Sequence, residues 1–459
     1  MCKMKKYGFL FVNFCLILAL VSCSNDNYTK ALPSGSTALM YVDVKQSGGA
    51  GNRDFLKNLV PMDSIGDCGL DFSQKLYFFE LADGTVGMCA SVDDARQVAE
   101  MLKKLAENDH CTEISEVGGV QTAVLNKSWV AAYDDVAFLM MFSVPATDIQ
   151  QAKSRLVRYL KQDGDRSDKF SRLFEKLNSM ETAAAIVGRG QTLLKTSDLD
   201  LPQGIDASQV LEAVGITVED SVVYARSNRF SFNEKVEKAL KDYERVLRPI
   251  EGRYTQNFSA HSFLNITMNV EGEQFLPMIQ KHETMMAFLA SANAVIDMNN
   301  IIKSVDGDVA MMYSGDFLSS DSQLLLLAQL SHSQWIADVD YWKTSTPKGG
   351  EIKVLDKDSY CYTDGKSPFY FGVDNGSNVT PKSASSQQFF CGNISEAASS
   401  PFEPAESPIP SAVTDKIKAN RLVVVVNLEK GGSLVGSMMK AAFQPFLGGF
   451  HTLVYIVES

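Results

Sequence analysis

Short apolar runs recur along the chain, each entered from a polar segment, and they predict β-strands. Four single runs begin at Thr37, Thr182, Asp308 and Arg421. Two longer runs turn back on themselves, at Asp134-Asp135 and near Asp364-Gly365. Because polar turn residues interrupt these two runs in the middle, we expect both to form β-hairpins.

The order of these elements is the same in the two halves of the chain. Strand, hairpin and strand begin at Thr37, Trp129 and Thr182 in the first half, and at Asp308, Ser359 and Arg421 in the second. This order predicts a degenerate duplication with two similar halves.

Five further segments carry apolar residues every three or four positions, which predicts amphipathic helices. They begin at Ser91, Thr147, Asp168, Asn233 and Gly272. In the first of them we expect Ser91 to be the N-cap, with acidic residues in the first turn. The apolar stripes need a sheet to cover, so the predicted class is α+β, with mostly antiparallel sheets covered by helices.

The N-terminus has a different pattern, which is typical of an export signal. Lys3, Lys5 and Lys6 precede an apolar run from Gly8 to Leu20, which is shorter than the roughly 20 residues that span a membrane. The residues that follow, Leu20 to Cys23, resemble the lipobox of bacterial lipoproteins. The resemblance implies that Cys23 is lipidated and becomes the new N-terminus; a secretory signal with a chance cysteine is the alternative.

These features divide the chain into four regions. We expect a lipoprotein signal peptide at 1–22, a lipidated tether at 23–31, an N-terminal α+β region at 32–300 and a C-terminal α+β region at 301–459. Residues 375–410 are rich in Ser, Pro and Asn, and we expect them to form one long surface loop. A loop of this length is uncommon unless it is functional or mobile.

Composition and charge exclude some classes of binding partner. The chain has a formal net charge of −12, and residues 1–22 hold three lysines and no acid, so the remainder carries about −15. Such a chain repels nucleic-acid backbones and anionic bilayers, which leaves the lipid as the sole membrane attachment. The hydrophobic fraction of 45% is enough for a sizeable core.

Cysteine spacing does not indicate a disulfide framework or a zinc site. Five cysteines remain once the signal and Cys23 are set aside: Cys68, Cys89, Cys111, Cys361 and Cys391. Their number is odd and their spacing irregular, so buried free thiols are favoured at Cys89 and Cys361. One bridge, Cys68 to Cys111 or Cys361 to Cys391, is the alternative.

Three local motifs resemble catalytic or metal sites, but each lacks essential partners. The HETMM sequence at His282 has no second histidine one turn later. Asp163, Asp165 and Asp168 lack the glycine and glutamate of a calcium loop, so a polar turn is the simpler interpretation. Ser437 and Lys440 match Ser-x-x-Lys without the motifs that accompany it in β-lactamases. We therefore predict no catalytic, cofactor-binding or metal-binding residue.

Two features leave a sugar-directed activity open. Acid pairs are abundant, and a glycosidase pair has no local sequence signature. The aromatic clusters Tyr341-Trp342 and Phe369 to Phe371 could stack on sugars, although such residues more often fill a core.

The chain also resembles a family of Bacteroidetes lipoproteins of similar size that is known only as a domain of unknown function. The likeness is carried by the lipobox, by YTKALP at 28–33, by STALMYVDV at 36–44 and by VDGDVAMMYSGDF at 305–317. It implies a cell-envelope location, and it supplies no catalytic residue. Ser24 to Asn27 contains one acid, whereas an acidic, lysine-led tract usually follows the cysteine of surface-exposed members, so the periplasmic side of the outer membrane is favoured over the cell surface.

Three functions are compatible with these observations. The leading one is a non-catalytic binding or scaffolding protein with an envelope protein or glycan as partner. The alternatives are a glycan-binding lipoprotein of a nutrient-uptake system and a glycan hydrolase with dispersed carboxylates. The first is favoured because no specific catalytic motif is present and because helical repeats typical of the second are missing.

Overall fold

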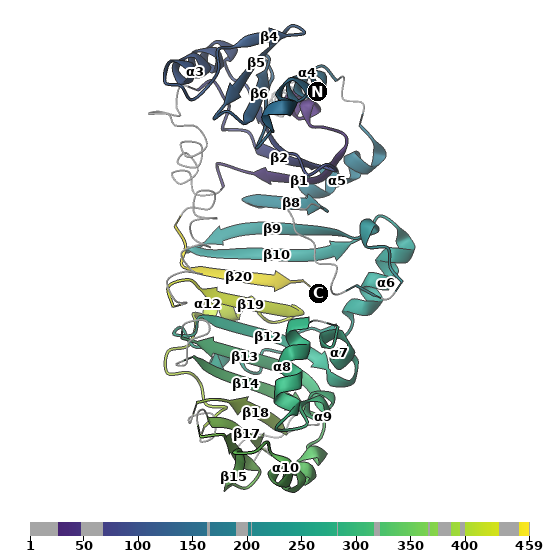
Figure 1. Cartoon of the computed structure of the whole chain (residues 1–459), viewed down its shortest axis with the longest axis vertical. Coiled ribbons are helices and arrows are strands. Elements are labelled where there is room, and N and C mark those ends of the chain that lie inside the picture. Colours follow the sequence, from purple (N-terminus) through teal and green to yellow (C-terminus); the bar gives the residue numbers. More distant parts are fainter. Residues whose placement is uncertain are drawn as a thin grey trace, which may run out of the picture. The chain divides into compact units, whose positions relative to one another are not determined.

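The computed structural model describes residues 26–46, 68–162, 166–189, 201–202, 204–281, 283–315, 322–365, 368–374, 387–394, 400–430 and 449–458 (Figure 1). It is a mixed α/β protein whose strands pair mostly antiparallel, which confirms this part of the predicted class. Contacts group the chain into two compact units. Unit 1 comprises Met1–Ser36 and Pro61–Ser171, and unit 2 comprises Thr37–Val60 and Arg172–Ser459.

The division between the two units differs from the one expected at residues 300/301. That position lies inside helix α9 (Met298–Lys303) of unit 2. Strands β12 (Leu264–Glu271) and β13 (Val305–Ser314), on either side of α9, pair antiparallel over eight residues. A boundary there would separate two hydrogen-bonded neighbours.

Unit 1 contains an antiparallel sheet with the strand order β2-β3-β7-β6-β5-β4. The strands are β2 (Leu76–Leu81), β3 (Val86–Ser91), β4 (Ser115–Val117), β5 (Val120–Leu125), β6 (Trp129–Tyr133) and β7 (Ala137–Met141). The short helix η1 (Asp26–Ala31) packs on β3 and β7, and α4 (Ile149–Leu160) packs on β6 and β7. Nearly every residue of β2, β3 and β7 is buried, which explains their continuous apolar sequences.

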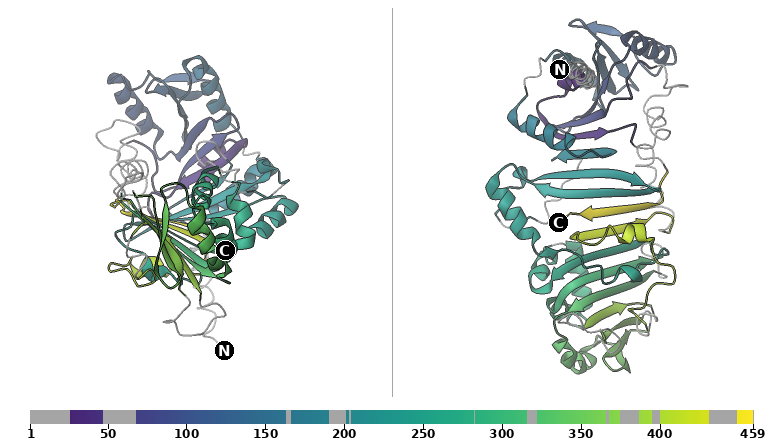
Figure 2. Two further views of the ribbon diagram at one scale, coloured as in Figure 1. Left: turned by 60° about the horizontal axis from the view of Figure 1, so that its bottom comes forward. Right: turned by 180° about the vertical axis from the view of Figure 1, so that it is seen from behind.

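Unit 2 contains one continuous sheet with the order β1-β8-β9-β10-β20-β19-β12-β13-β14-β18-β17-β16-β15, and β11 extends it beside β12. The remaining strands are β1 (Ser36–Val42), β8 (Ala184–Gly188), β9 (Leu211–Glu219), β10 (Val222–Phe230), β11 (Leu247–Arg248), β14 (Gln323–Leu330), β15 (Glu351–Asp356), β16 (Ser359–Thr363), β17 (Pro368–Asp374), β18 (Gln388–Gly392), β19 (Leu422–Asn427) and β20 (Thr452–Val457). Strands β10 and β20 pair in parallel. The teal strands β9 and β10 and the yellow β20 lie side by side in the view from behind (Figure 2).

Alternation along the strands of unit 2 separates two cores, one on each face of the sheet. In β18, Phe389 and Cys391 join one core and Phe390 joins the other. Helices α7 (Gly272–Ile279), α8 (Glu283–Asn293), α9 and α10 (Val339–Ser345) contribute to the first core. The second is covered by residues 250–258 and by the segment around α12 (Ser411–Thr414). The two-residue period therefore places apolar residues on both faces.

The predicted helices are present, with two corrections to their ends. Helix α3 (Ala95–Glu107) is capped by Asp94, whose side chain accepts a bond from the Arg96 backbone N–H, and Ser91 instead ends strand β3. The segment from Gly272 forms two helices, α7 and α8, rather than one. Helices α4, α5 (Asp168–Asn178) and α6 (Glu234–Glu244) lie where their periodicity predicts them. No helix among the described residues is both long enough and apolar enough to cross a membrane.

Residues 375–410 do not form one surface loop in the part that is described. Gln388–Gly392 form strand β18, which is buried throughout and pairs with β14 and β17. Pro408 makes a further bridge to Ser259. The apolar sequence of β18 provides the burial that stabilises a strand within an otherwise polar segment.

Two series of strands follow the same order. Unit 1 has β2-β3-β7-β6-β5-β4, and unit 2 contains β13-β14-β18-β17-β16-β15, again all antiparallel. Within unit 2, β1-β8-β9 likewise matches β12-β19-β20. In this order the strand from Thr37 corresponds to β12, and not to the strand from Asp308. The duplication itself stays a prediction.

Candidate functional site

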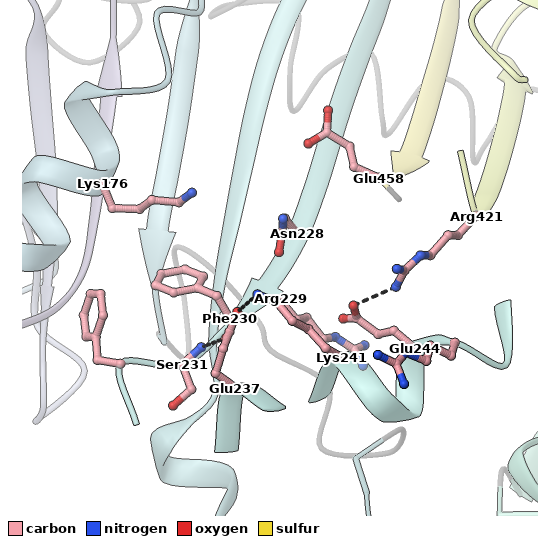
Figure 3. Close-up of a pocket in the computed structure, with 12 residues that line it drawn as sticks. Lys176, Asn228, Arg229, Phe230, Ser231, Glu237, Lys241, Glu244, Arg421 and Glu458 are labelled. Atoms are coloured by element: carbon pink, nitrogen blue, oxygen red, sulfur yellow. Dashed lines mark hydrogen bonds and ion pairs between the residues drawn. The ribbon is translucent and has the colours of Figure 1, made fainter. Parts of the chain in front are cut away.

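A polar cavity of about 530 Å³ opens in unit 2 (Figure 3). It is lined by Lys176, Asn228, Arg229, Phe230, Ser231, Phe232, Glu237, Lys241, Glu244, Arg245, Arg421 and Glu458. In the view of Figure 3, Lys176 reaches in from one side and Arg421 from the other, with Asn228 between them. The volume lies in the range of small-molecule sites, about 300 to 1,000 Å³.

The ends of three strands form one wall of the cavity. Because β10 and β20 run parallel, both end at the same edge of the sheet. The Glu458 backbone N–H donates to the Ser227 carbonyl at 3.2 Å, and the Arg421 N–H donates to the Val457 carbonyl at 3.0 Å. These bonds hold Arg421, at the start of β19, beside Glu458, at the end of β20.

Helix α6 forms another wall. Its N-cap is Asn233, whose side chain accepts a bond from the Lys235 N–H. Glu237, Lys241 and Glu244 follow at spacings of four and three residues, so they share one face of the helix. All three line the cavity.

Every glutamate of the cavity has a charged or hydrogen-bonding partner. Glu244 accepts a bond from Arg421 Nη1 at 2.8 Å. Glu237 pairs with Lys241 at 3.0 Å and also accepts a bond from the Ser231 backbone N–H at 2.7 Å. Glu458 lies 3.5 Å from Arg226.

Positive charge nevertheless predominates. Five basic and three acidic residues line the cavity, an excess of two positive charges in a chain whose net charge is −12. Arg245 pairs with Asp242, and Glu458 with Arg226, both outside the lining. Asp242 adds one negative charge and Arg226 adds one positive charge, so the excess of two positive charges is unchanged when these two partners are counted.

Glu244 titrates abnormally. Burial raises the pKa of its carboxyl above the ordinary glutamate value, although the nearby guanidinium groups of Arg421 and Arg229 act in the opposite direction. Glu237 adds a smaller upward effect on the pKa. Desolvation therefore outweighs the ion pair at this site.

Phenylalanine side chains form the apolar part of the lining. The Phe230 and Phe232 rings meet edge to face, with centroids 5.4 Å apart. The Lys176 ammonium lies 5.6 Å from the Phe230 centroid, and the Arg172 guanidinium lies 4.0 Å from that of Phe232. Through these cation–π contacts, positively charged groups lie directly beside the aromatic rings of the cavity.

None of the described residues that line this cavity belongs to the motifs singled out in the sequence. Cys23, Asp163, Asp165, His282 and the segment 437–440 lie outside the described residues. Asp168 is the first residue of α5. In the described part of the chain, no three His, Cys, Asp or Glu side chains are grouped as they would be to hold a metal ion.

The aromatic candidates are mainly core residues. Trp342 stacks on Trp335, with centroids 6.0 Å apart, and both are buried together with Phe371. Tyr341, in contrast, is 70% exposed. Because Trp342 and Phe371 lie in the core of unit 2, the suggestion that Trp342 could stack on a sugar is wrong.

No disulfide joins any of the five described cysteines, so neither suggested bridge forms. Burial of Cys89 and Cys361 agrees with the prediction. Desolvation raises the pKa of the Cys391 thiol to about 12 and that of Cys111 to about 11. The buried thiols are therefore core residues, not activated nucleophiles.

Comparison with known proteins identifies a family but no activity. A family model described as a domain of unknown function, DUF4836, matches residues 52–384. A search of curated proteins found no match. The chain is similar to two solved structures, titled crystal form I and crystal form III of TP0453, with 12% and 15% sequence identity, respectively. The similarity covers 48% of this chain and 87% and 85% of those chains, and the TM-score is 0.29 in both cases. At these TM-scores the similarity carries no argument about fold or function. Since the family match spans most of the chain, this protein belongs to the DUF4836 family of domains of unknown function.

Proposed function

We propose that this protein is a lipid-anchored protein of the cell envelope that works by binding and not by catalysis. The anchor rests on the lipobox-like sequence from Leu20 to Cys23. The resemblance to Bacteroidetes lipoproteins supports the outer membrane as its location, and the single acid in Ser24 to Asn27 favours the periplasmic side.

One observation carries the non-catalytic assignment: all three cavity glutamates are engaged by bases or by a backbone N–H. Glu244 is held by Arg421, Glu237 by Lys241 and Ser231, and Glu458 by Arg226. A glycosidase needs one carboxylic acid to protonate a leaving group and one carboxylate to attack or to activate water. Glutamates held in this way are better suited to shaping a charged binding cavity.

A hydrolase is the second candidate, because the pKa of Glu244 is raised. A raised pKa is what a general acid requires at neutral pH. Against this, Glu244 is bonded to Arg421, and the buried Trp342 lies in a core cluster and does not line the cavity. The binding assignment therefore leads.

We also propose that the chain arose by duplication of one α+β unit. The matching orders of β2-β3-β7-β6-β5-β4 and β13-β14-β18-β17-β16-β15 support this. A helical segment follows the second strand of each series, α3 after β3 and η5 (Gln334–Asp338) with α10 after β14. A crystal structure of the protein tests the proposal by superposition of the two series, and unrelated positions of the corresponding strands would contradict it.

Fractionation tests the anchor. The Cys23→Ser protein should leave the membrane fraction, since the lipid is the proposed attachment. If this variant still sediments with membranes after a salt wash, the anchor is wrong.

A glycan-hydrolysis screen with the same protein tests the mode of action. We expect no turnover. Turnover that is lost in Glu244→Gln but kept in Glu351→Gln, a substitution on the exposed strand β15, would replace binding by hydrolysis as the function.

A further inference from the structure

We infer that the cavity of unit 2 binds a small organic anion, which lies between Lys176 and Arg421 and whose apolar part lies against Phe230. The inference rests on the proposed binding function and names the ligand class. Its basis is the geometry of the cavity and the distribution of charge around it.

Lys176 is the first element of the site. Its ammonium contacts the Phe230 ring, 5.6 Å from the centroid, and makes no ion pair with any residue that the structure describes. An ammonium beside an aromatic face and without a carboxylate is available to an incoming anion. Neighbouring Asn228 is exposed and has an amide N–H₂ that can donate to the same anion.

Arg421 is the second element. Its guanidinium has five N–H donors in a planar fork that matches carboxylate and phosphate. Among the described residues, Glu244 is the one hydrogen-bond partner of the Arg421 side chain, and it is bonded to Nη1. The Arg421 side chain is 18% exposed, so it is held in place while part of it still reaches the cavity.

Glu244 gives the site a pH dependence. Its neighbours are Arg421 before β19, Arg229 on β10 and Glu237 on its own helix. Protonation of Glu244 removes a negative charge and releases Arg421, so both effects strengthen anion binding. Because the pKa of Glu244 is raised, we expect affinity to increase as pH falls through that raised value.

The size and apolar lining define the rest of the ligand. A volume of about 530 Å³ admits a monomeric metabolite. The edge-to-face pair of Phe230 and Phe232 provides an apolar wall. A ligand with a ring or short apolar chain beside its anionic group fits this combination better than a bare inorganic ion.

Isothermal titration of the full-length protein, purified in a neutral detergent, tests the inference. The probes are phenyl phosphate, benzoate and the neutral analogue phenol. We expect saturable binding of at least one of the anions and much weaker binding of phenol. Vesicles containing phosphatidic acid are then added as competitors. Displacement of the bound probe by the vesicles identifies a lipid headgroup as the source of the anion, and no displacement identifies a free solute. Either result supports the anion site.

Matched variants localise the binding. Lys176→Met should weaken anion binding about tenfold or more, the usual loss for one charge-assisted hydrogen bond, and Lys176→Arg should retain most of it. The control is Lys238→Met, which removes one positive charge from an exposed position of α6 outside the cavity lining. It should bind as the parent protein does.

The outcomes separate the two proposals. Equal binding of phenol and phenyl phosphate, equal affinities of Lys176→Met and Lys238→Met, or no binding of either anion would overturn the anion site and leave the binding function standing. Release of phenol from phenyl phosphate would support the anion site and overturn the non-catalytic function.

Discussion

Arg421→Met removes the partner of a mostly buried carboxylate while it keeps the aliphatic volume of the side chain. In the native pair, 18% of the Arg421 side chain and 26% of the Glu244 side chain are exposed. Breaking a fully buried pair costs about 3 to 5 kcal/mol, whereas exposed pairs contribute about 0 to 1 kcal/mol. For this intermediate exposure we expect the free energy of unfolding to fall by about 2 kcal/mol at neutral pH.

Tryptophan fluorescence during urea unfolding provides the assay. The chain has three tryptophans, of which Trp129 lies in unit 1 and Trp335 and Trp342 lie in the core of unit 2. In a Trp129→Phe background the signal therefore reports on unit 2 alone. Lys241→Met is the control: Lys241 is 68% exposed in its pair with Glu237, so we expect a change of about 0.5 kcal/mol or less.

The pH dependence decides whether charge is the cause. Without Arg421, the pKa of Glu244 should rise further, so the penalty should shrink as pH falls and the carboxyl becomes protonated. The double variant Arg421→Met with Glu244→Gln should recover most of the lost stability. A penalty that is unchanged at about pH 4, or a double variant as unstable as Arg421→Met, would refute this reasoning.

Three other changes test the electrostatics and packing. The stability that Glu244 contributes is full below the ordinary glutamate pKa and is lost as pH rises through its raised value, so Glu244→Gln should flatten this part of the stability–pH curve in urea unfolding. Phe389 is fully buried and meets Trp335 edge to face at 5.7 Å, so Phe389→Ala should cost about 3 to 5 kcal/mol by the same assay. A thiol reagent followed by peptide mapping should label the half-buried Cys111 before the fully buried Cys89, and earlier labelling of Cys89 would contradict this packing.

The elements predicted by the hydrophobic pattern form, but the pattern leaves out more than half of the described strands and does not predict which strands are neighbours. The runs from Thr37, Thr182, Asp308 and Arg421 all form strands, because continuous apolar segments must be buried. Pairing depends on contacts between residues far apart in sequence, and the periodicity of one segment contains no information about its partner. For the same reason, the predicted boundary at 300/301 falls between the paired strands β12 and β13.

Strand β18 is one of the strands that the sequence pattern misses. Strand β18 has five residues and is flanked by Ser-rich sequence, so composition over a longer window indicates a loop. Its burial comes from β14 and β17 on either side. Tertiary contacts therefore stabilise this strand despite its polar flanking sequence, and these contacts are seen only in the folded structure.

The cavity could not be predicted from sequence, because no short segment contains it. Lys176, Arg229, Glu244, Arg421 and Glu458 come from two helices and from the ends of three strands. The nearest local signal is the spacing of Glu237, Lys241 and Glu244 on α6, and this spacing is equally typical of an ordinary solvated helix face.

The position of the cavity in the sheet also connects it to the proposed duplication. Strand β10 lies between β9 and β20, which are the last strands of the matching series β1-β8-β9 and β12-β19-β20. Arg229 comes from β10 itself, whereas Arg421 and Glu458 come from the ends of the second series. Lys176 comes from α5, the helix that precedes β8 of the first series, so a single copy of the series would lack either Lys176 or the pair Arg421 and Glu458. The cavity, and with it any anion site, therefore depends on the two series being joined through β10.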